Sequence, residues 1–296
     1  MIDGNTFIFS IVGDPVAQVR LPQVMEVVFR ELKVNGVCVP MHVDREGLKA
    51  VVQALRTMRN WRAMCVTIPH KAAVAAMLDR LSPRARIAGA VNLVRRGPDG
   101  QLFGDIVDGA GFVRGLELHG HSVKGAAVWL VGVGGAGCAI AGALAEAKVG
   151  RLSLRDADPR RAMAMIERLK RAYPDLAVEL ADEPPAALDF AVNATPLGLE
   201  RAQPLPFDPT RLPGGTLVCD IVMQPRETAL LQASQARGLR VHHGSHMLDA
   251  QVPMYLEFLG IAPSPQRGPA GRKASAARRR AGSAAASRRA TRRTLR

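Results

Sequence analysis

The segment Leu130-Val131-Gly132-Val133-Gly134-Gly135-Ala136-Gly137 is the strongest indication of fold in this chain. An apolar, β-branched run leads into it and an alanine-rich stretch follows it. The order of strand, glycine turn and helix gives G-x-G-x-x-G a mechanism for binding a dinucleotide. The first glycine makes a tight turn, the second lets a pyrophosphate approach, and the third lets the helix pack on the strand. The helix start adds free N–H groups. The segment therefore predicts a bound dinucleotide.

The motif begins only at residue 132, so a second folding unit of more than a hundred residues precedes it. Alternating strand and helix patterns predict an α/β fold with largely parallel sheets. We expect two α/β domains and a tail. The first spans residues 1–107 and is completed by 246–262, the Rossmann dinucleotide-binding domain spans 108–245, and the tail spans 263–296. The expected early helices cover 22–33, 46–59 and 70–81, and residues 90–95 and 101–106 form an expected hairpin.

The basic charge of the chain is concentrated at its end. The stretch from Pro265 onward holds 11 of the 40 Lys and Arg residues and none of the 26 Asp and Glu residues. The rest of the chain therefore carries a net charge of only +3, against +14 for the whole. Because the tail has almost no large apolar residue, we predict that it is disordered. It is either a solvated extension or a nonspecific tether to nucleic acid or an anionic surface.

The cysteines and histidines do not predict a metal site. Cys38, Cys65, Cys138 and Cys219 form no C-x-x-C pair, and the histidines near residue 243 lack a zinc-type companion pattern. Unpaired thiols suit a reducing cytosol, so we expect a cytoplasmic protein. The sequence shows neither a signal-peptide pattern nor a run of about 18 apolar residues, which predicts no membrane association.

Polar residues stand beside several further strand ends. The segments are Val66-Thr67-Ile68-Pro69-His70-Lys71, Gly89-Ala90-Val91-Asn92, Gly104-Asp105-Ile106-Val107-Asp108-Gly109, Asn193-Ala194-Thr195-x-x-Gly198, Asp220 with Pro225 and Thr228, and Met247-Leu248-x-x-Gln251. Together with the glycine loop, and in this order, they resemble the shikimate dehydrogenase family and its quinate/shikimate dehydrogenase relatives. Each motif is weak alone, but the ordered set is specific and covers most of residues 8–260.

The resemblance implies an NAD(P)-dependent oxidoreductase of the shikimate/quinate type. Such an enzyme moves a hydride reversibly between nicotinamide and a ring hydroxyl or ketone, as between shikimate and 3-dehydroshikimate or in a related cyclic alcohol. By resemblance, Lys71 and Asp108 are the catalytic pair, and the domain that precedes the glycine loop binds substrate. Alcohol oxidation also releases a proton, which a positioned acid–base group must take. We expect Lys71 to transfer that proton, with Asp108 holding Lys71 and the reacting hydroxyl.

The resemblance also assigns the substrate-binding residues. Thr67, Asn92 and Gln251 match substrate-binding positions, and an amide that both donates and accepts suits a diol. Where the family reads S-K-S-P, with serines that bind a carboxylate, this chain has Val19-Arg20-Leu21-Pro22. Met223 occupies the position of the family's usual tyrosine, and Cys65 occupies that of an asparagine.

These departures bear on the substrate. We expect Val19, Leu21 and Met223 to line the substrate site. A buried carboxylate without donors is unfavourable, although Arg20 could supply a bidentate contact. The substrate is then either a less polar cyclic alcohol or a carboxylate held in a different manner.

The choice between NAD and NADP rests on Asp156, which follows Gly132 by 24 residues. A carboxylate near this separation accepts from the adenosine 2′-hydroxyl and repels a 2′-phosphate. Asp156-Ala157-Asp158 also resembles the D-x-D of NAD-using relatives, so we favour NAD. The neighbouring arginines at 155, 160 and 161 keep NADP open, and Asp156 could instead cap the following helix. Cofactor-binding residues are then, by motif or resemblance, Gly132, Gly134, Gly135, Ala136, Gly137, Asp156, Asp158, Asn193, Thr195 and Gly244.

A second hypothesis is a catalytically weak, ligand-sensing relative that binds nucleotide or a shikimate-like ligand. Retention of Lys71 and Asp108 argues against it, whereas loss of the two serines favours it. A nucleic-acid-binding role is the weakest alternative, because aromatic residues make up only 4% of the chain. We expect a small cyclic hydroxy compound as the partner and a monomer or homodimer as the assembly.

Overall fold

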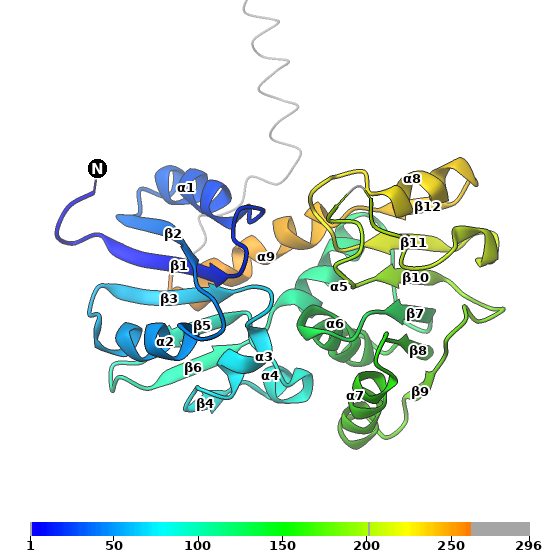
Figure 1. Ribbon diagram of the computed structural model, residues 1–296, viewed down its shortest axis with the longest axis horizontal. Coiled ribbons are helices and arrows are strands. Elements are labelled where there is room, and N and C mark those ends of the chain that lie inside the picture. The colour runs from blue at the N-terminus through cyan, green and yellow to red at the C-terminus, as the bar shows by residue number, and fades with distance from the viewer. Residues whose placement is uncertain (1, 201, 262–296) are drawn as a thin grey trace, which may run out of the picture. The chain divides into compact units, whose positions relative to one another are not determined.

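Two six-stranded sheets organise the part of the chain that the structure describes (Figure 1). The structure is a computed structural model and describes residues 2–200 and 202–261. The predicted disordered tail, 263–296, lies outside the described residues. The two α/β sheets confirm the fold class that the sequence predicted.

The first sheet is mixed, with strand order β2-β1-β3-β5-β6-β4. Strands β2, β1 and β3 run parallel, β5 runs antiparallel to β3 and forms an antiparallel hairpin with β6, and β4 pairs in parallel with β6. The hairpin was predicted, but the sheet is less parallel than expected. The strands are β1 (Phe7–Gly13), β2 (Gly36–His42), β3 (Trp61–Val66), β4 (Arg80–Leu81), β5 (Leu93–Arg96) and β6 (Leu102–Asp105).

The helices of the first sheet each bury one apolar face. In α2, Leu48, Val52 and Leu55 recur at helical spacing, and all three are buried. The predicted helix over 70–81 was wrong beyond its first turn, because Arg80 and Leu81 pair with β6 instead. The helices are α1 (Leu21–Glu31), α2 (Leu48–Thr57), α3 (Lys71–Ala75) and α4 (Pro83–Ala88).

The second sheet is wholly parallel, with order β12-β11-β10-β7-β8-β9. Counted from its own first strand, this is the 3-2-1-4-5-6 order of a Rossmann fold, whose strand order reverses between β7 and β10. The strands are β7 (Ala127–Val131), β8 (Arg151–Arg155), β9 (Ala177–Leu180), β10 (Phe190–Asn193), β11 (Leu217–Asp220) and β12 (Arg240–His242). The helices are α6 (Gly135–Glu146), α7 (Pro159–Ala172), the 3-10 turn η1 (Pro209–Arg211) and α8 (Ala229–Ala236).

Two further helices, α5 (Asp108–Leu118) and α9 (Ser245–Phe258), pack against each other. A Cβ at Gly111 would clash with Gln251, so the two backbones approach closely there. At its far end α9 meets the first sheet, where Phe258 stacks on Phe103 with 6.2 Å between ring centroids. Thus α9 follows the second sheet in sequence yet contacts the first.

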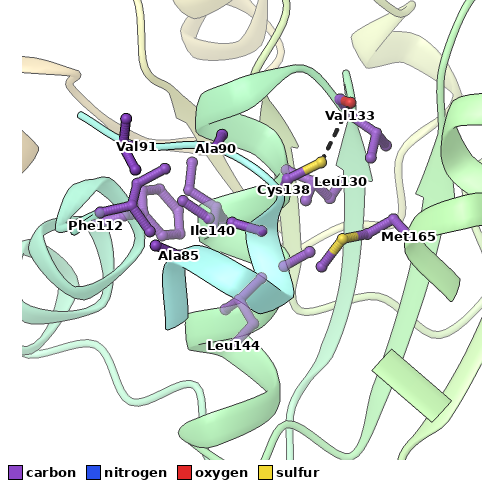
Figure 2. Packing of buried hydrophobic residues seen from close by; sticks show 14 of the residues in the cluster. Ala85, Ala90, Val91, Phe112, Leu130, Val133, Cys138, Ile140, Leu144 and Met165 are labelled. Atoms are coloured by element: carbon purple, nitrogen blue, oxygen red, sulfur yellow. Dashed lines mark hydrogen bonds between the residues drawn. The ribbon is translucent and has the colours of Figure 1, made fainter. Parts of the chain in front are cut away.

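One apolar core joins the segments before and after α5 (Figure 2). Ala85 and Val91 come from before this helix, Phe112 comes from the helix itself, and Ile140 and Leu144 come from α6. The chain through Gly260 accordingly forms one compact unit. No described helix is both long and apolar enough to cross a membrane.

Candidate active site

A buried ion pair lies where two helices begin. Lys71 is the first residue of α3 and Asp108 the first residue of α5. The Lys71 Nζ donates to Asp108 Oδ2, and the side chains are only 12% and 6% exposed. The pair is therefore shielded from bulk water. Charge–charge interactions are stronger in such a buried place than at the protein surface.

Two amides complete the surroundings of the Asp108 carboxylate. Asn92 Nδ2 donates to Asp108 Oδ1 at 2.8 Å, and Asn92 Oδ1 accepts from the Val107 N–H at 2.9 Å. Gln251 Nε2 donates to the same Asp108 oxygen at 3.4 Å. The structure thus brings together four predicted residues from distant parts of the chain.

Tyr255 belongs to this group, although sequence reasoning missed it. Its hydroxyl donates to Gln251 Oε1 one helical turn away on α9. Burial, followed by nearby Cys65 and Asp108, raises the pKa of Tyr255 well above its usual value. Tyr255 therefore remains a neutral donor that fixes the Gln251 amide. The i, i+4 spacing of the two residues was the available signal.

The remaining predicted substrate residues take no part in this hydrogen-bonded group within the described chain. Thr67 directly follows β3, and its N–H donates to the Val12 carbonyl at 2.9 Å. Val19 is partly buried, and Leu21 begins α1 with 3% exposure. Met223 is partly buried beyond the end of β11. Apolar side chains stand at 19 and 21, so these two positions offer a ligand no hydroxyl donors.

The glycine loop has the geometry that a dinucleotide needs. Gly132 has a φ of 99°, a conformation that side chains disfavour. A Cβ at Gly137 would clash with the Gly132 carbonyl, so the helix packs closely on the strand end. Nothing lies within 4 Å of a Cβ built at Gly134, and this residue caps α6. Ala136 follows in the first turn of α6, whose N–H groups are free to bind an anion. These residues fit a pyrophosphate.

Lys71 lies against this loop. A Cβ built on Gly135 would come within 3.0 Å of Lys71 Cβ and 3.1 Å of its Cδ. The aliphatic stem of Lys71 therefore covers Gly135 while its ammonium reaches Asp108. The ion pair and the dinucleotide loop are parts of one site.

The two aspartates after β8 have different partners. Asp156 Oδ2 accepts from the Val133 N–H at 2.6 Å, which holds it against the glycine loop. Asp158 caps α7 by accepting from the Arg160 N–H, and it pairs with the Arg160 guanidinium at 2.9 Å. That guanidinium lowers the pKa of the Asp158 carboxyl. The helix cap is thus Asp158, and the alternative interpretation of Asp156 as a cap was wrong.

Asn193 and Thr195 form a network at the end of β10. The Asn193 amide donates to Leu197 O at 3.1 Å and to Asp220 Oδ1 at 3.0 Å. Its Oδ1 accepts from both the N–H and the hydroxyl of Thr195. These four bonds use the full capacity of an asparagine side chain. Asn193 therefore shapes the loop that abuts Gly132.

Gly244 occupies the turn before α9. It is buried, and a Cβ there would lie 2.6 Å from the Val222 carbonyl oxygen. The turn passes so close to the residues after β11 that only glycine fits at this position. Its backbone is thereby fixed beside the carboxyl end of the parallel sheet, the edge at which ligands of such sheets bind.

A Rossmann sheet, a glycine loop and an adjoining Lys–Asp pair define a two-sheet dehydrogenase that uses a nicotinamide dinucleotide. The family model for the shikimate dehydrogenase substrate binding domain matches residues 11–94. A shikimate dehydrogenase (NADP(+)) of Rubrobacter xylanophilus is 39% identical over 270 residues, covering 88% of this chain and 94% of the relative.

Solved structures are similar over the same extent. Shikimate 5-dehydrogenase from Listeria monocytogenes, in complex with shikimate and NAD, is 28% identical with a TM-score of 0.79, and 89% and 95% of the two chains are covered. A 5-ketofructose reductase of a Gluconobacter strain is 26% identical with a TM-score of 0.76, covering 88% and 95%. The chain belongs to the shikimate dehydrogenase family, which confirms the predicted class of NAD(P)-dependent oxidoreductase.

Proposed function

We propose that this protein catalyses reversible hydride transfer between NAD and the ring carbon that bears a hydroxyl, with Lys71 and Asp108 as the catalytic pair. The observation that carries the proposal is the position of Lys71. Its stem lies on Gly135 of the dinucleotide loop, and its ammonium meets a carboxylate that two amides orient. A bound nicotinamide supplies the hydride acceptor. For ketone reduction the Lys71 ammonium donates a proton to the ketone oxygen, and for alcohol oxidation the neutral Lys71 amine takes the hydroxyl proton, while Asp108 orients both groups.

Substrate hydroxyls are bound, in this proposal, by Asn92 and Gln251. Each amide already donates to Asp108, so a hydroxyl that enters the group is aligned with the same carboxylate. Thr67 contributes from the end of β3, and Val19, Leu21 and Met223 line the other side. The domain boundaries follow: residues 1–107 with 246–262 bind substrate, and residues 108–245 bind the dinucleotide.

The proposed preference for NAD rests on Asp156. Its carboxylate is held at the loop by the Val133 N–H, where it can accept from an adenosine 2′-hydroxyl. Of the arginines that favour NADP, Arg160 pairs with Asp158, and Arg155 lies over the Trp129 ring at 5.9 Å. Both guanidinium groups thus have partners within the protein, whereas Arg161 is exposed in the first turn of α7 and keeps NADP as the alternative cofactor. Asn193, Thr195 and Gly244 act by shaping the backbone around the cofactor.

The proposed substrate is a cyclic polyhydroxy compound that needs no hydroxyl donors for a carboxylate. Val19 and Leu21 replace hydroxyl donors with apolar groups, whereas the hydroxyl-binding amides are retained. One similar protein is named 5-ketofructose reductase, and 5-ketofructose has no carboxylate.

The four free thiols in the described chain are consistent with a cytoplasmic enzyme.

The direct test is a spectrophotometric screen for reduction of NAD and of NADP. The candidate substrates are shikimate, quinate and ring polyols that lack a carboxylate. We expect turnover with NAD and a higher kcat/KM for a carboxylate-free polyol than for shikimate. Turnover of shikimate alone would overturn the substrate proposal. Binding of the dinucleotide with turnover of none of the compounds would favour the ligand-sensing alternative.

A further inference from the structure

Three histidines from distant parts of the chain meet at the C-terminal end of α5, whereas Asp108 lies at its N-terminal end. His119 follows the last residue of α5, His242 ends β12, and His246 lies in the first turn of α9. One ring nitrogen from each lies within 4.8 Å of the others. The His119 and His246 rings stack with centroids 3.7 Å apart, and His242 meets His246 edge-on at 4.6 Å.

The tautomer of His119 leaves a nitrogen ready to bind a metal. Its Nδ1 lies 2.8 Å from the Gly115 carbonyl oxygen, which can only accept. Nδ1 therefore carries the proton, and Nε2 presents its lone pair. Metal-binding histidines usually have this arrangement, in which the second ring nitrogen donates to a carbonyl or carboxylate that orients the ring.

His242 supplies an unsatisfied buried polar atom. The residue is 3% exposed, and its Nε2 has no hydrogen-bond partner. Its Nδ1 faces His246 Nδ1 at 3.3 Å. If His242 Nδ1 donates, Nε2 is a buried acceptor without a donor, and if Nδ1 accepts, Nε2 is a buried donor without an acceptor. His242 therefore has one unpaired buried nitrogen in either tautomer, and its Nδ1 is the nitrogen placed to bind an ion together with His246.

The spacing of the two facing nitrogens suits a tetrahedral ion. Nitrogens bound to Zn²⁺ at about 2.0–2.1 Å in tetrahedral geometry are about 3.3 Å apart. Each ring coordinates in its neutral form, through a nitrogen that carries no proton.

We propose that His119, His242 and His246 form a site for a divalent transition metal of the Zn²⁺ class. Three imidazoles are ligands typical of zinc, and the exposed His119 leaves the site open for exchange and for a water as fourth ligand. A bound ion would link the end of α5, the end of β12 and the start of α9. Because α5 begins at Asp108 and α9 carries Gln251, it would stabilise the two helices that hold the catalytic group.

The test uses the full chain without a histidine tag, stripped of metal with a chelator. Calorimetric titration with Zn²⁺ alone is compared in the wild type, H119Q, H246Q and the control H42Q, whose histidine side chain is 61% exposed and lies outside the cluster. We expect one Zn²⁺ per chain in the wild type and in H42Q. Each cluster variant should bind at least about 10-fold more weakly.

A second readout separates coordination from a folding defect. Cobalt(II) bound by the wild type should show the intense visible absorption of a tetrahedral site, and Zn²⁺ should raise the melting temperature. Both effects should be lost in H119Q, whose metal-free melting temperature should stay near that of the wild type. Absence of Zn²⁺ binding by the wild type, or wild-type affinity for Zn²⁺ in H119Q and H246Q, would overturn the proposal.

Discussion

At the scale of single residues, the site depends on the partners of the Asp108 carboxylate. One of its oxygens meets Lys71, and the other accepts from Asn92 and Gln251. Removing one partner of a buried pair leaves a charge in a poorly solvated place. Here the two amides still donate to Asp108 when Lys71 is changed, so catalysis and stability can be separated by substitution.

Asp156 should set the cofactor preference. Asp156→Asn keeps an oxygen for the Val133 N–H but removes the charge that repels a 2′-phosphate. We expect the ratio of kcat/KM for NAD to that for NADP to fall by about 10-fold, which corresponds to about 1.4 kcal/mol. Asp208→Asn, at the cap of the distant turn η1, is the matched control. An unchanged ratio in D156N would refute the assigned role.

Val19 should limit binding of a carboxylate. Val19→Ser restores one hydroxyl donor, and a hydrogen bond to a charged group contributes about 1.5–3 kcal/mol. We therefore expect KM for shikimate to fall by about 10-fold or more in V19S, and to stay unchanged for a ring polyol without a carboxylate. Val19→Ala controls for the loss of volume. If V19S and V19A behave alike toward shikimate, position 19 does not face the carboxylate.

At the scale of elements, the contact between α5 and α9 positions Gln251. Gly111→Ala would push its new methyl group into Gln251, whereas Gly142→Ala on α6 meets only Ile87 at an ordinary 3.7 Å. We expect G111A to raise KM for the hydroxy substrate several-fold and to lower stability by about 1–3 kcal/mol. G142A should be neutral or more stable by about 0.5–1 kcal/mol. Similar kinetics in the two variants would show that this contact does not position Gln251.

The sequence predicted those elements whose pattern is local. The glycine loop, α6 and the Asp156 turn are set by residues that are neighbours in the chain. The predicted helix over 70–81 failed because Asp79 accepts from Leu102 N–H at 2.7 Å, and Arg80 and Leu81 then join β6. That pairing involves a strand about twenty residues away. Local periodicity contains no information about it.

The candidate site shows the same division. The family resemblance predicted that Lys71, Asn92, Asp108 and Gln251 belong to one site. The structure places them within one hydrogen-bonded group. Tyr255 was missed because its role depends on the rotamer of Gln251. The histidine cluster was missed because its third member, His119, lies far from His242 and His246 in sequence and meets them only through the packing of α5 on α9.

At the scale of the whole molecule, we expect the basic tail to be dispensable for catalysis. Every assigned site residue lies within residues 2–261, and removal of residues 263–296 lowers the formal net charge from +14 to +3. We expect the truncated protein to keep its turnover and dinucleotide affinity. Any salt-sensitive binding of the full chain to DNA should weaken. Loss of turnover on truncation would show that the tail contributes to the enzyme.

The proposed chemistry of the whole molecule depends on Lys71, which joins the dinucleotide loop to the substrate-binding residues. Lys71→Met keeps the stem over Gly135 and removes only the ammonium. The decisive measurement is the turnover of K71M on the substrate that the screen identifies, together with its dinucleotide affinity. Lys124→Met, at an exposed position, is the control. We predict that kcat falls by about 100-fold or more while dinucleotide affinity stays within about 3-fold of wild type. Near-normal turnover in K71M with intact cofactor binding would contradict the assignment of Lys71 as the proton-transfer residue.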